Sequence, residues 1–324
     1  MADFAADKNK SRGGTLVLPF FFLRVFGALF FTFAAVSAGQ LSAITAKADD
    51  PAHSTEFKGP LDFDKNGRPL VQVKINGRGP FTFLFDTAAS RSVIYDNLVA
   101  VLGLETQNLK FRRVMTATGV REAPLYHLVR FEALGRTLEK LETVALPFGR
   151  DPALYGIIGV DLMRGQVFHL QRDKRTISVL NQLPQNMAAW DHIEGRYVGY
   201  GSIALQVQLD GQDVPAILDT GASTTVLNTP ASSMLAKSGG ATVVESKTPR
   251  IVASNGSFSG GYSQVSEMQF GTGVFRTIKL AVANLPAFTT FGARNAPAMI
   301  LGMDYLDKRQ LMLDMQRMDL YVQD

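Results

Sequence analysis

Beyond a polar stretch from Asp49 to Gly67, hydrophobic and polar residues alternate in short runs separated by Gly, Pro, Asn and Asp. The segment PLVQVKING, Pro69–Gly77, alternates residue by residue and ends in an Asn-Gly pair. A period of two is typical of a half-buried strand that leads into a hairpin turn. Long amphipathic patterns are missing, and short helices are predicted only at Ile94–Leu102 and Pro230–Lys237. The pattern therefore predicts an all-β protein.

One pattern occurs twice in the chain. The first copy, Val71–Ile94, reads VQVKINGRGPFTFLFDTAASRSVI, and the second, Leu205–Leu227, reads LQVQLDGQDVPAILDTGASTTVL. Each copy holds an alternating strand, an Asn-Gly or Asp-Gly turn, a second apolar strand and the sequence Asp-Thr-x-Ala-Ser. The two aspartates, Asp86 and Asp219, are 219 − 86 = 133 positions apart. A repeat of this length indicates two similar lobes.

Further segments recur in the same order. GIIGVDLM at Gly156–Met163 corresponds to MILGMDYL at Met299–Leu306, and a polar-turned hairpin follows each of them. Between the landmarks, Arg112–Val120 and Pro249–Ser257 are apolar strands that end in small residues. The stretch that holds the only tryptophan, Trp190, joins the copies. These segments predict a first lobe at residues 68–180 and a second at 202–324, with linkers at 49–67 and 181–201.

The amino-acid composition excludes several kinds of catalytic and metal-binding group. The 324 residues contain no cysteine, which excludes disulfides, thiol nucleophiles and thiolate metal sites. The four histidines lack the spacing that places two metal ligands on one helix face, so no metal site and no cofactor are expected. A formal net charge of +4, partly from the N-terminal segment, gives no indication of nucleic-acid binding.

The first 48 residues have the features of a targeting segment. Lys8, Lys10 and Arg12 precede the apolar stretch Thr15–Gly39. The small-x-small sequence Ala46-Lys47-Ala48 suits a cleaved signal peptide, with a mature chain that starts at Asp49. An uncleaved anchor that uses the whole of residues 15–39 is the alternative. Either version predicts a periplasmic or secreted domain, and the second places it at the outer face of the cytoplasmic membrane.

The repeated aspartates are candidates for catalysis. Each follows an apolar run, so its carboxyl should lie at the mouth of a core and be partly desolvated. A single aspartate there is most often a turn residue, but two similar lobes would bring the equivalent turns together. Two adjacent carboxyls cannot both ionise, so the pair holds one proton and can serve as base and acid at once.

With these residues the chain resembles the retropepsin-like aspartic proteases, in the fused two-lobe arrangement that pepsin-type enzymes share. FLFDTAAS and AILDTGAS match the active-site loop of that family, and GIIGVDL and MILGMDY match the segment that supports the loop. The match covers roughly Leu70–Asp324. It implies two closed barrel-like lobes related by a pseudo-twofold axis, with Asp86 and Asp219 as the aspartates that bind the lytic water.

The resemblance also implies roles for the neighbours of the aspartates. Thr87 and Thr220 would cross-link the two loops, with residues 88 and 221 as further loop support. Flaps would lie at Arg113–Val120 and Ile251–Ser257, and they lack the flap tyrosine of pepsin. The substrate-contacting residues expected there are Ala117, Thr118, Gly119, Ser254, Asn255 and Gly256.

One residue departs from the family pattern. The first loop has Ala88 where the family has glycine, and its Cβ could crowd the partner loop or disfavour a strained backbone angle. The sequence therefore favours an endopeptidase that takes extended peptides as a monomer, since both lobes are in one chain. One alternative is an inactive peptide-binding or adaptor domain of the cell envelope, which the unusual Ala88 suggests. The other is a purely structural envelope protein.

Overall fold

The computed structural model describes residues 57–116, 119–148, 151–239, 242–244, 250–253 and 256–323. The predicted signal or anchor, residues 1–48, lies outside these ranges. Within them, no helix combines the length and hydrophobicity that are needed to cross a bilayer.

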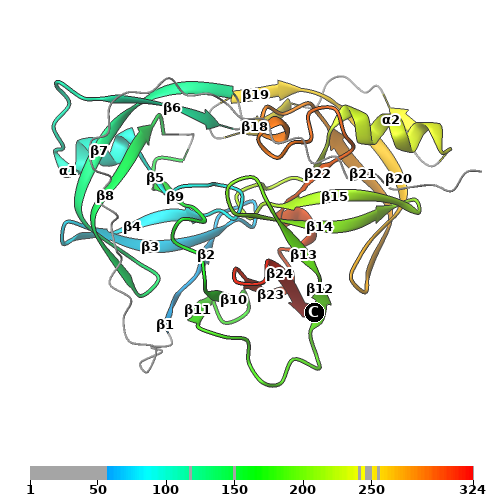
Figure 1. Cartoon of the computed structure of the whole chain (residues 1–324), viewed down its shortest axis with the longest axis horizontal. Coiled ribbons are helices and arrows are strands. Elements are labelled where there is room, and N and C mark those ends of the chain that lie inside the picture. The colour runs from blue at the N-terminus through cyan, green and yellow to red at the C-terminus, as the bar shows by residue number, and fades with distance from the viewer. Residues whose placement is uncertain are drawn as a thin grey trace, which may run out of the picture. The chain divides into compact units, whose positions relative to one another are not determined.

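The first lobe is a closed ring of six strands, in the order β3-β4-β9-β5-β8-β7 (Figure 1). The ring closes because β3 pairs with β4 on one side and with β7 on the other. Strands β2 and β6 add to β3 and β7 outside the ring. The elements of this lobe are β2 (Asp62–Phe63), β3 (Pro69–Ile75), β4 (Arg78–Phe85), β5 (Val93–Tyr95), α1 (Asp96–Leu102), β6 (Phe111–Thr116), β7 (Gly119–Ala133), β8 (Arg136–Leu146) and β9 (Leu154–Ile158).

The second lobe repeats this ring as β14-β15-β22-β16-β21-β20, which closes through the pairing of β14 with β20. A separate hairpin, β18–β19, accompanies it. The elements are β13 (Gly195–Val198), β14 (Ser202–Leu209), β15 (Gln212–Leu218), β16 (Val226–Leu227), α2 (Thr229–Lys237), β17 (Thr242–Val244), β18 (Arg250–Ala253), β19 (Gly256–Ser259), β20 (Gly261–Phe270), β21 (Gly273–Val282), α3 (Ala287–Thr290), β22 (Met299–Leu301) and the 3-10 turn η1 (Met303–Tyr305). The expected all-β fold with two barrel-like lobes is thus confirmed for the described residues.

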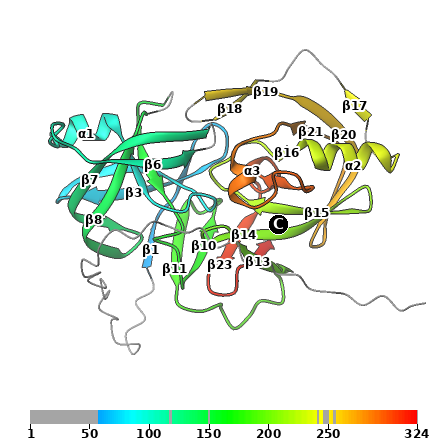
Figure 2. The same ribbon diagram turned by 45° about the horizontal axis from the view of Figure 1, so that its top comes forward.

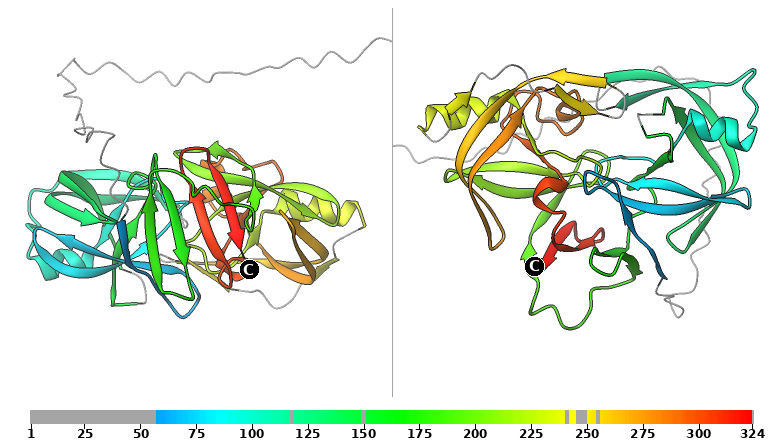
Figure 3. Two further views of the ribbon diagram at one scale, coloured as in Figure 1. Left: turned by 90° about the horizontal axis from the view of Figure 1, so that it is seen from below. Right: turned by 180° about the vertical axis from the view of Figure 1, so that it is seen from behind.

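A third sheet joins the two lobes (Figure 3). Its order is β1-β11-β10-β23-β24-β12, so that three strands of each half meet at β10 and β23. The strands are β1 (Phe57–Pro60), β10 (Val167–Gln171), β11 (Thr176–Leu180), β12 (Asp191–Ile193), β23 (Gln310–Asp314) and β24 (Asp319–Gln323). From the two edges to the centre, β1, β11 and β10 correspond to β12, β24 and β23, as a pseudo-twofold repeat requires. Strands β1 and β12 lie in the stretches predicted as linkers, which therefore also carry sheet structure.

The alternating strand and its turn form as the sequence predicts. In β3, every second residue is buried and the residues between them are partly or fully exposed. The turns that follow β3 and β14 have left-handed backbone at both central residues, with φ of 51° at Asn76, 74° at Gly77, 47° at Asp210 and 76° at Gly211. Asn-Gly and Asp-Gly adopt such angles at low cost, which explains both hairpins.

Both predicted short helices are present. Helix α1 starts two residues later than the predicted Ile94–Leu102 and stops before Gly103, which takes φ of 65°. Helix α2 begins where the Asn228 side chain accepts a hydrogen bond from the Ala231 amide at 2.9 Å. Such an N-cap satisfies one of the amides that the first helical turn leaves unpaired.

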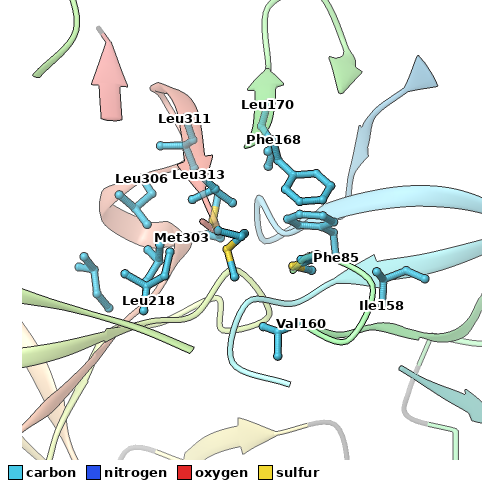
Figure 4. Close-up of a cluster of buried hydrophobic side chains, with 14 of the residues drawn as sticks. Phe85, Ile158, Val160, Phe168, Leu170, Leu218, Met303, Leu306, Leu311 and Leu313 are labelled. Atoms are coloured by element: carbon cyan, nitrogen blue, oxygen red, sulfur yellow. The ribbon is translucent and has the colours of Figure 1, made fainter. Parts of the chain in front are cut away.

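The main hydrophobic core runs through both lobes and the shared sheet (Figure 4). Phe85 at the end of β4 packs against Phe168 of β10, with ring centroids 5.4 Å apart. Leu218, at the corresponding end of β15, belongs to the same core with Leu313 of β23. All four side chains are fully buried. Removing a buried aromatic ring costs about 3–5 kcal/mol, so this core fixes the strand ends from which the two repeated aspartates follow.

Candidate active site

The two repeated aspartates occupy equivalent places in the lobes. Asp86 follows β4 and donates its amide to the carbonyl of Ile158 in β9 at 3.0 Å. Asp219 follows β15 and donates its amide to the carbonyl of Leu301 in β22 at the same distance. Each aspartate therefore starts a loop that is held between two parallel strands of its barrel. Both residues are partly buried.

The threonines after the aspartates tie the two loops together. The hydroxyl of Thr87 donates to the carbonyl of Leu218 at 2.7 Å, and that of Thr220 donates to the carbonyl of Phe85 at 2.6 Å. Each hydroxyl also accepts the other threonine's amide, at 3.2 Å and 3.1 Å. Both threonines are fully buried. Four hydrogen bonds thus cross between the lobes directly beneath the carboxyls.

Removing one of these hydroxyls is expected to destabilise the protein. Thr87→Val or Thr220→Val leaves a buried carbonyl and a buried amide without partners, which should lower the free energy of unfolding by about 2–4 kcal/mol. Thr82→Val, on β4 but partly exposed, is the matched control. Chemical denaturation of the three variants measures the difference. A loss no larger than about 0.5 kcal/mol, the usual range for surface changes, would contradict the structural role.

The carboxyl groups meet across the interface between the loops. The Asp86 carboxyl lies against the second loop, since a Cβ on Gly221 would be 2.3 Å from its Oδ2 atom, and its negative charge acts on Asp219. The Oδ1 atom of Asp86 accepts from the amides of Ala88 at 2.8 Å and Ala89 at 3.0 Å. The Oδ1 atom of Asp219 accepts from the amide of Ala222 at 2.9 Å. Two neighbouring buried carboxyls disfavour ionisation of both at once, so the pair is set up to share one proton.

Both carboxyls hold a proton more strongly than an exposed aspartate does. Burial raises the pKa of Asp86, while the amides of Ala88 and Ala89 oppose the rise. Burial raises the pKa of Asp219 well above its usual range, and the negative charge of Asp86 adds to the effect. Because each carboxyl disfavours ionisation of the other, the pair favours a state that holds one shared proton.

The residue after Thr220 is a glycine for a steric reason, and the residue after Thr87 has different surroundings. A Cβ placed on Gly221 would lie 2.3 Å from Oδ2 of Asp86, so this loop has no room for a methyl group. In the first loop, the methyl of Ala88 packs against the hydrophobic cluster of the second lobe. Neither residue has a positive φ. The departure at Ala88 therefore imposes no left-handed backbone angle.

The second landmark of the repeat lies against the active-site loops, as the resemblance implied. The amide of Val160 donates to the carbonyl of Ala89 at 2.8 Å, and that of Met303 donates to the carbonyl of Ala222 at 2.9 Å. A Cβ on Gly159 would lie 2.7 Å from the carbonyl oxygen of Ala89. Glycine at this position therefore permits the close approach of the two segments.

A hydroxyl and a carboxylate reinforce each loop, and these residues were not among the predicted site residues. The Ser92 hydroxyl donates to Asp161 at 2.8 Å in the first lobe. The Thr225 hydroxyl donates to Asp304 at 2.6 Å in the second. The amides of Ser92 and Thr225 donate to the same carboxylates. The sequence does contain a pattern that could have identified them, because a hydroxyl residue stands six places after each repeated aspartate.

The predicted flaps are both β-hairpins. In the first lobe, β6 and β7 pair up to Thr116 and Gly119, and Ala117 and Thr118 lie outside the described residues. In the second, β18 and β19 pair up to Ala253 and Gly256, while Ser254 and Asn255 lie outside the described residues. Both hairpins lie at the upper edge of Figure 1. Their contact with substrate stays a prediction.

Two further residues near the carboxyls were not predicted as site residues. Arg68, just before β3, hydrogen-bonds through Nη1 to the carbonyl of Gly221 at 3.4 Å. Tyr95, at the end of β5, is fully buried, and its pKa is raised by burial and by the charge of Asp86. Neither belongs to the repeated motif, so the repeat in the sequence gives no indication of them.

Comparison with known proteins agrees with this geometry. The family model described as Aspartyl protease matches residues 71–162 and 205–305. One match falls in each lobe, and each contains one of the paired aspartates and its supporting segment. A search of curated proteins gives no match. Because the matched ranges cover more than half of the 324 residues, the chain belongs to the retropepsin-like aspartyl protease family.

Proposed function

We propose that the protein is an aspartic-type endopeptidase that hydrolyses peptide bonds with a water activated by Asp86 and Asp219. The observation that carries the proposal is that the hydrogen bonds of Thr87 and Thr220 join the two aspartate loops, with the Asp86 carboxyl against Gly221 of the other loop. General acid–base catalysis needs one partner that accepts a proton and one that donates it. A singly protonated pair provides both within one site.

We assign Asp86 as the base of the reaction because its carboxylate accepts two loop amides, those of Ala88 and Ala89. Asp86, as the base, takes a proton from water while the water oxygen bonds to the carbonyl carbon of the substrate. Asp219 gives its proton to the carbonyl oxygen, which forms a tetrahedral diol. Asp86 then passes its proton to the amide nitrogen as the C–N bond breaks. One diol hydroxyl returns a proton to Asp219, so the pair ends in its starting state.

The substrate proposed is an extended peptide or protein segment. Two hairpins, β6–β7 and β18–β19, belong to the two lobes whose loops carry the carboxyls. Extended peptides bind to strand edges through main-chain hydrogen bonds, and side-chain pockets provide selectivity. Both aspartates come from one chain, so a second copy is not needed to complete the site, and we propose a monomer.

Digestion of a peptide library by the full chain over a pH series tests the proposal. Cleavage within peptides, with new amino and carboxyl termini, is expected from acid to neutral pH. The inactive binding module is the alternative. Binding of library peptides with no cleavage at any pH, together with the same behaviour in an Asp86→Asn variant, would favour the binding module over the enzyme.

We also propose that the domain works beyond the cytoplasmic membrane, from the basic and apolar features of residues 1–48. Mass spectrometry of the N-terminus after expression in a bacterial host distinguishes the two versions. A chain that begins at Asp49 in the periplasm indicates cleavage. A retained Met1 in the membrane fraction indicates an anchor at residues 15–39. Soluble full-length protein in the cytoplasm would contradict both.

A further inference from the structure

Arg68 has a fixed position beside the carboxyl pair. Its Nε and Nη2 atoms contact Oδ2 of Asp64 at 2.7 Å and 2.6 Å, and its amide donates to Oδ1 of the same residue at 3.0 Å. The Asp64 side chain is only 8% exposed and that of Arg68 21%. An ion pair with this geometry and burial orients the guanidinium more firmly than an exposed pair would.

In this orientation the Nη1 atom of Arg68 points to the second lobe. Asp64 occupies the edge formed by Nε and Nη2, which leaves Nη1 for the carbonyl of Gly221 at 3.4 Å. Gly221 is also the residue on which a Cβ would touch the Asp86 carboxyl. The contact therefore reaches the backbone against which the carboxyl of Asp86 lies.

The charge of Arg68 acts on both members of the pair. Its electrostatic attraction lowers the pKa of Asp86 and of Asp219, in each case against the larger effect of burial. It acts on Tyr95 in the same direction. A cation near two buried carboxyls favours the form in which one of them is ionised.

The twofold repeat does not supply a second such cation. Val71 aligns with Leu205, so three residues earlier Arg68 aligns with Ser202. Ser202 is 2% exposed and uncharged. The second lobe builds the same barrel with a serine at this place, so the barrel itself does not need an arginine there.

We propose that Arg68 is a positioning residue of the protease site, which orients the second active-site loop through Gly221 and, by its fixed positive charge, keeps one carboxyl of the pair ionised. The role in catalysis rests on the proposed function, but the effect on the carboxyls does not.

The other charged groups around Arg68 bear on the expected pH dependence. Asp64 pairs with it from the loop before β3. From the segment after η1, Asp307 packs against Gly67, and Arg172, at the end of β10, lies 4.0 Å from the Asp307 carboxylate. The buried phenol of Tyr95 completes the set on the side of the first barrel. These groups stay in place when Arg68 alone is changed.

Three variants of the full chain separate charge from structure. Arg68→Met keeps most of the side-chain length and removes the charge, whereas Arg68→Lys keeps the charge. Arg175→Met is the matched control, because Arg175 also pairs with an aspartate of the same lobe, Asp62, but is 68% exposed. The ¹³C signals of the Asp86 and Asp219 carboxyls, assigned with single Asn variants, are followed by NMR against pH. The pH profile of kcat/KM is the second readout.

The sign of the effect follows from the charge. Without the cation, ionised carboxyl is disfavoured, so in Arg68→Met the carboxyl titrations and the acid flank of the pH profile should move to higher pH. On that flank kcat/KM should fall by about tenfold, which is the size of effect expected when a carboxyl loses a nearby positive charge. Arg68→Lys should restore most of the wild-type position, and Arg175→Met should match wild type.

Two outcomes decide the proposal. If both carboxyls of Arg68→Met titrate as in wild type, the proposal is overturned and the role of Arg68 is structural. In that case the variant would lose activity equally at all pH values, or would show only a lower unfolding temperature. A displaced titration in a protein that cleaves no peptide would instead contradict the protease assignment and support the role of Arg68 at the pair.

Discussion

Asp86→Asn and Asp219→Asn are each expected to abolish peptide hydrolysis while the fold stays intact. Each variant removes one of the two proton-transfer partners, and such transfers contribute about 10²–10⁴-fold to rate constants. An amide has nearly the volume of a carboxyl, so the hydrogen bonds from the loop amides to Asp86 and Asp219 can persist. Loss of kcat/KM by at least about 10²-fold in both variants is the predicted result.

The control for this experiment is Asp213→Asn. Asp213 is exposed and lies on β15, the strand that leads to Asp219. Its variant should keep wild-type activity, and thermal unfolding of all three variants should show no loss of stability. If either Asp86→Asn or Asp219→Asn kept more than a few per cent of the activity, a mechanism that needs two carboxyls would be wrong.

Gly221→Ala should also cause a large loss of activity. The new methyl carbon would lie 2.3 Å from Oδ2 and 2.5 Å from Cγ of Asp86, closer than non-bonded atoms approach. The Asp86 carboxyl must then leave the position that the amides of Ala88 and Ala89 define. Displacing a catalytic group by about 1 Å can cost about 10²-fold in rate. Comparison of kcat/KM for the variant and wild type measures the loss.

Ala88→Gly is the matched control in the other loop. It removes a methyl group that packs against the second lobe and adds backbone freedom to the unfolded chain, so a loss of about 0.5–1 kcal/mol in stability is expected. Turnover should change modestly. Wild-type activity in Gly221→Ala would refute the steric argument, and activity that appears only in Ala88→Gly would identify Ala88 as a disabling residue.

The barrels and the paired loops could be predicted because they rest on local patterns that occur twice. Alternation in Pro69–Ile75, Asn-Gly and Asp-Gly turns and the repeated Asp-Thr-x-Ala-Ser sequence each have one favoured structure. Symmetric packing then places Asp86 and Asp219 together. The crossing hydrogen bonds of Thr87 and Thr220 follow the pattern of the family that these residues resemble.

The features that escaped prediction depend on contacts between distant residues. Strands β1 and β12 are four and three residues long, too short for a clear periodicity, and they form only against β11 and β24. Arg68 meets Gly221 across 153 positions of sequence. The steric reason for glycine at position 221 appears only when the carboxyl of Asp86 is in place.

The pH dependence of kcat/KM, measured on the peptide that the wild-type chain cleaves best, tests whether Asp86 and Asp219 act as one catalytic pair. A bell-shaped profile is expected, because the site works only with one proton on the pair. Both flanks then report the ionisation of Asp86 and Asp219. The carboxyl titrations seen by NMR should coincide with those flanks. A profile that rises or falls in one direction only, or cleavage that persists in the Asp86→Asn and Asp219→Asn double variant, would contradict catalysis by this pair.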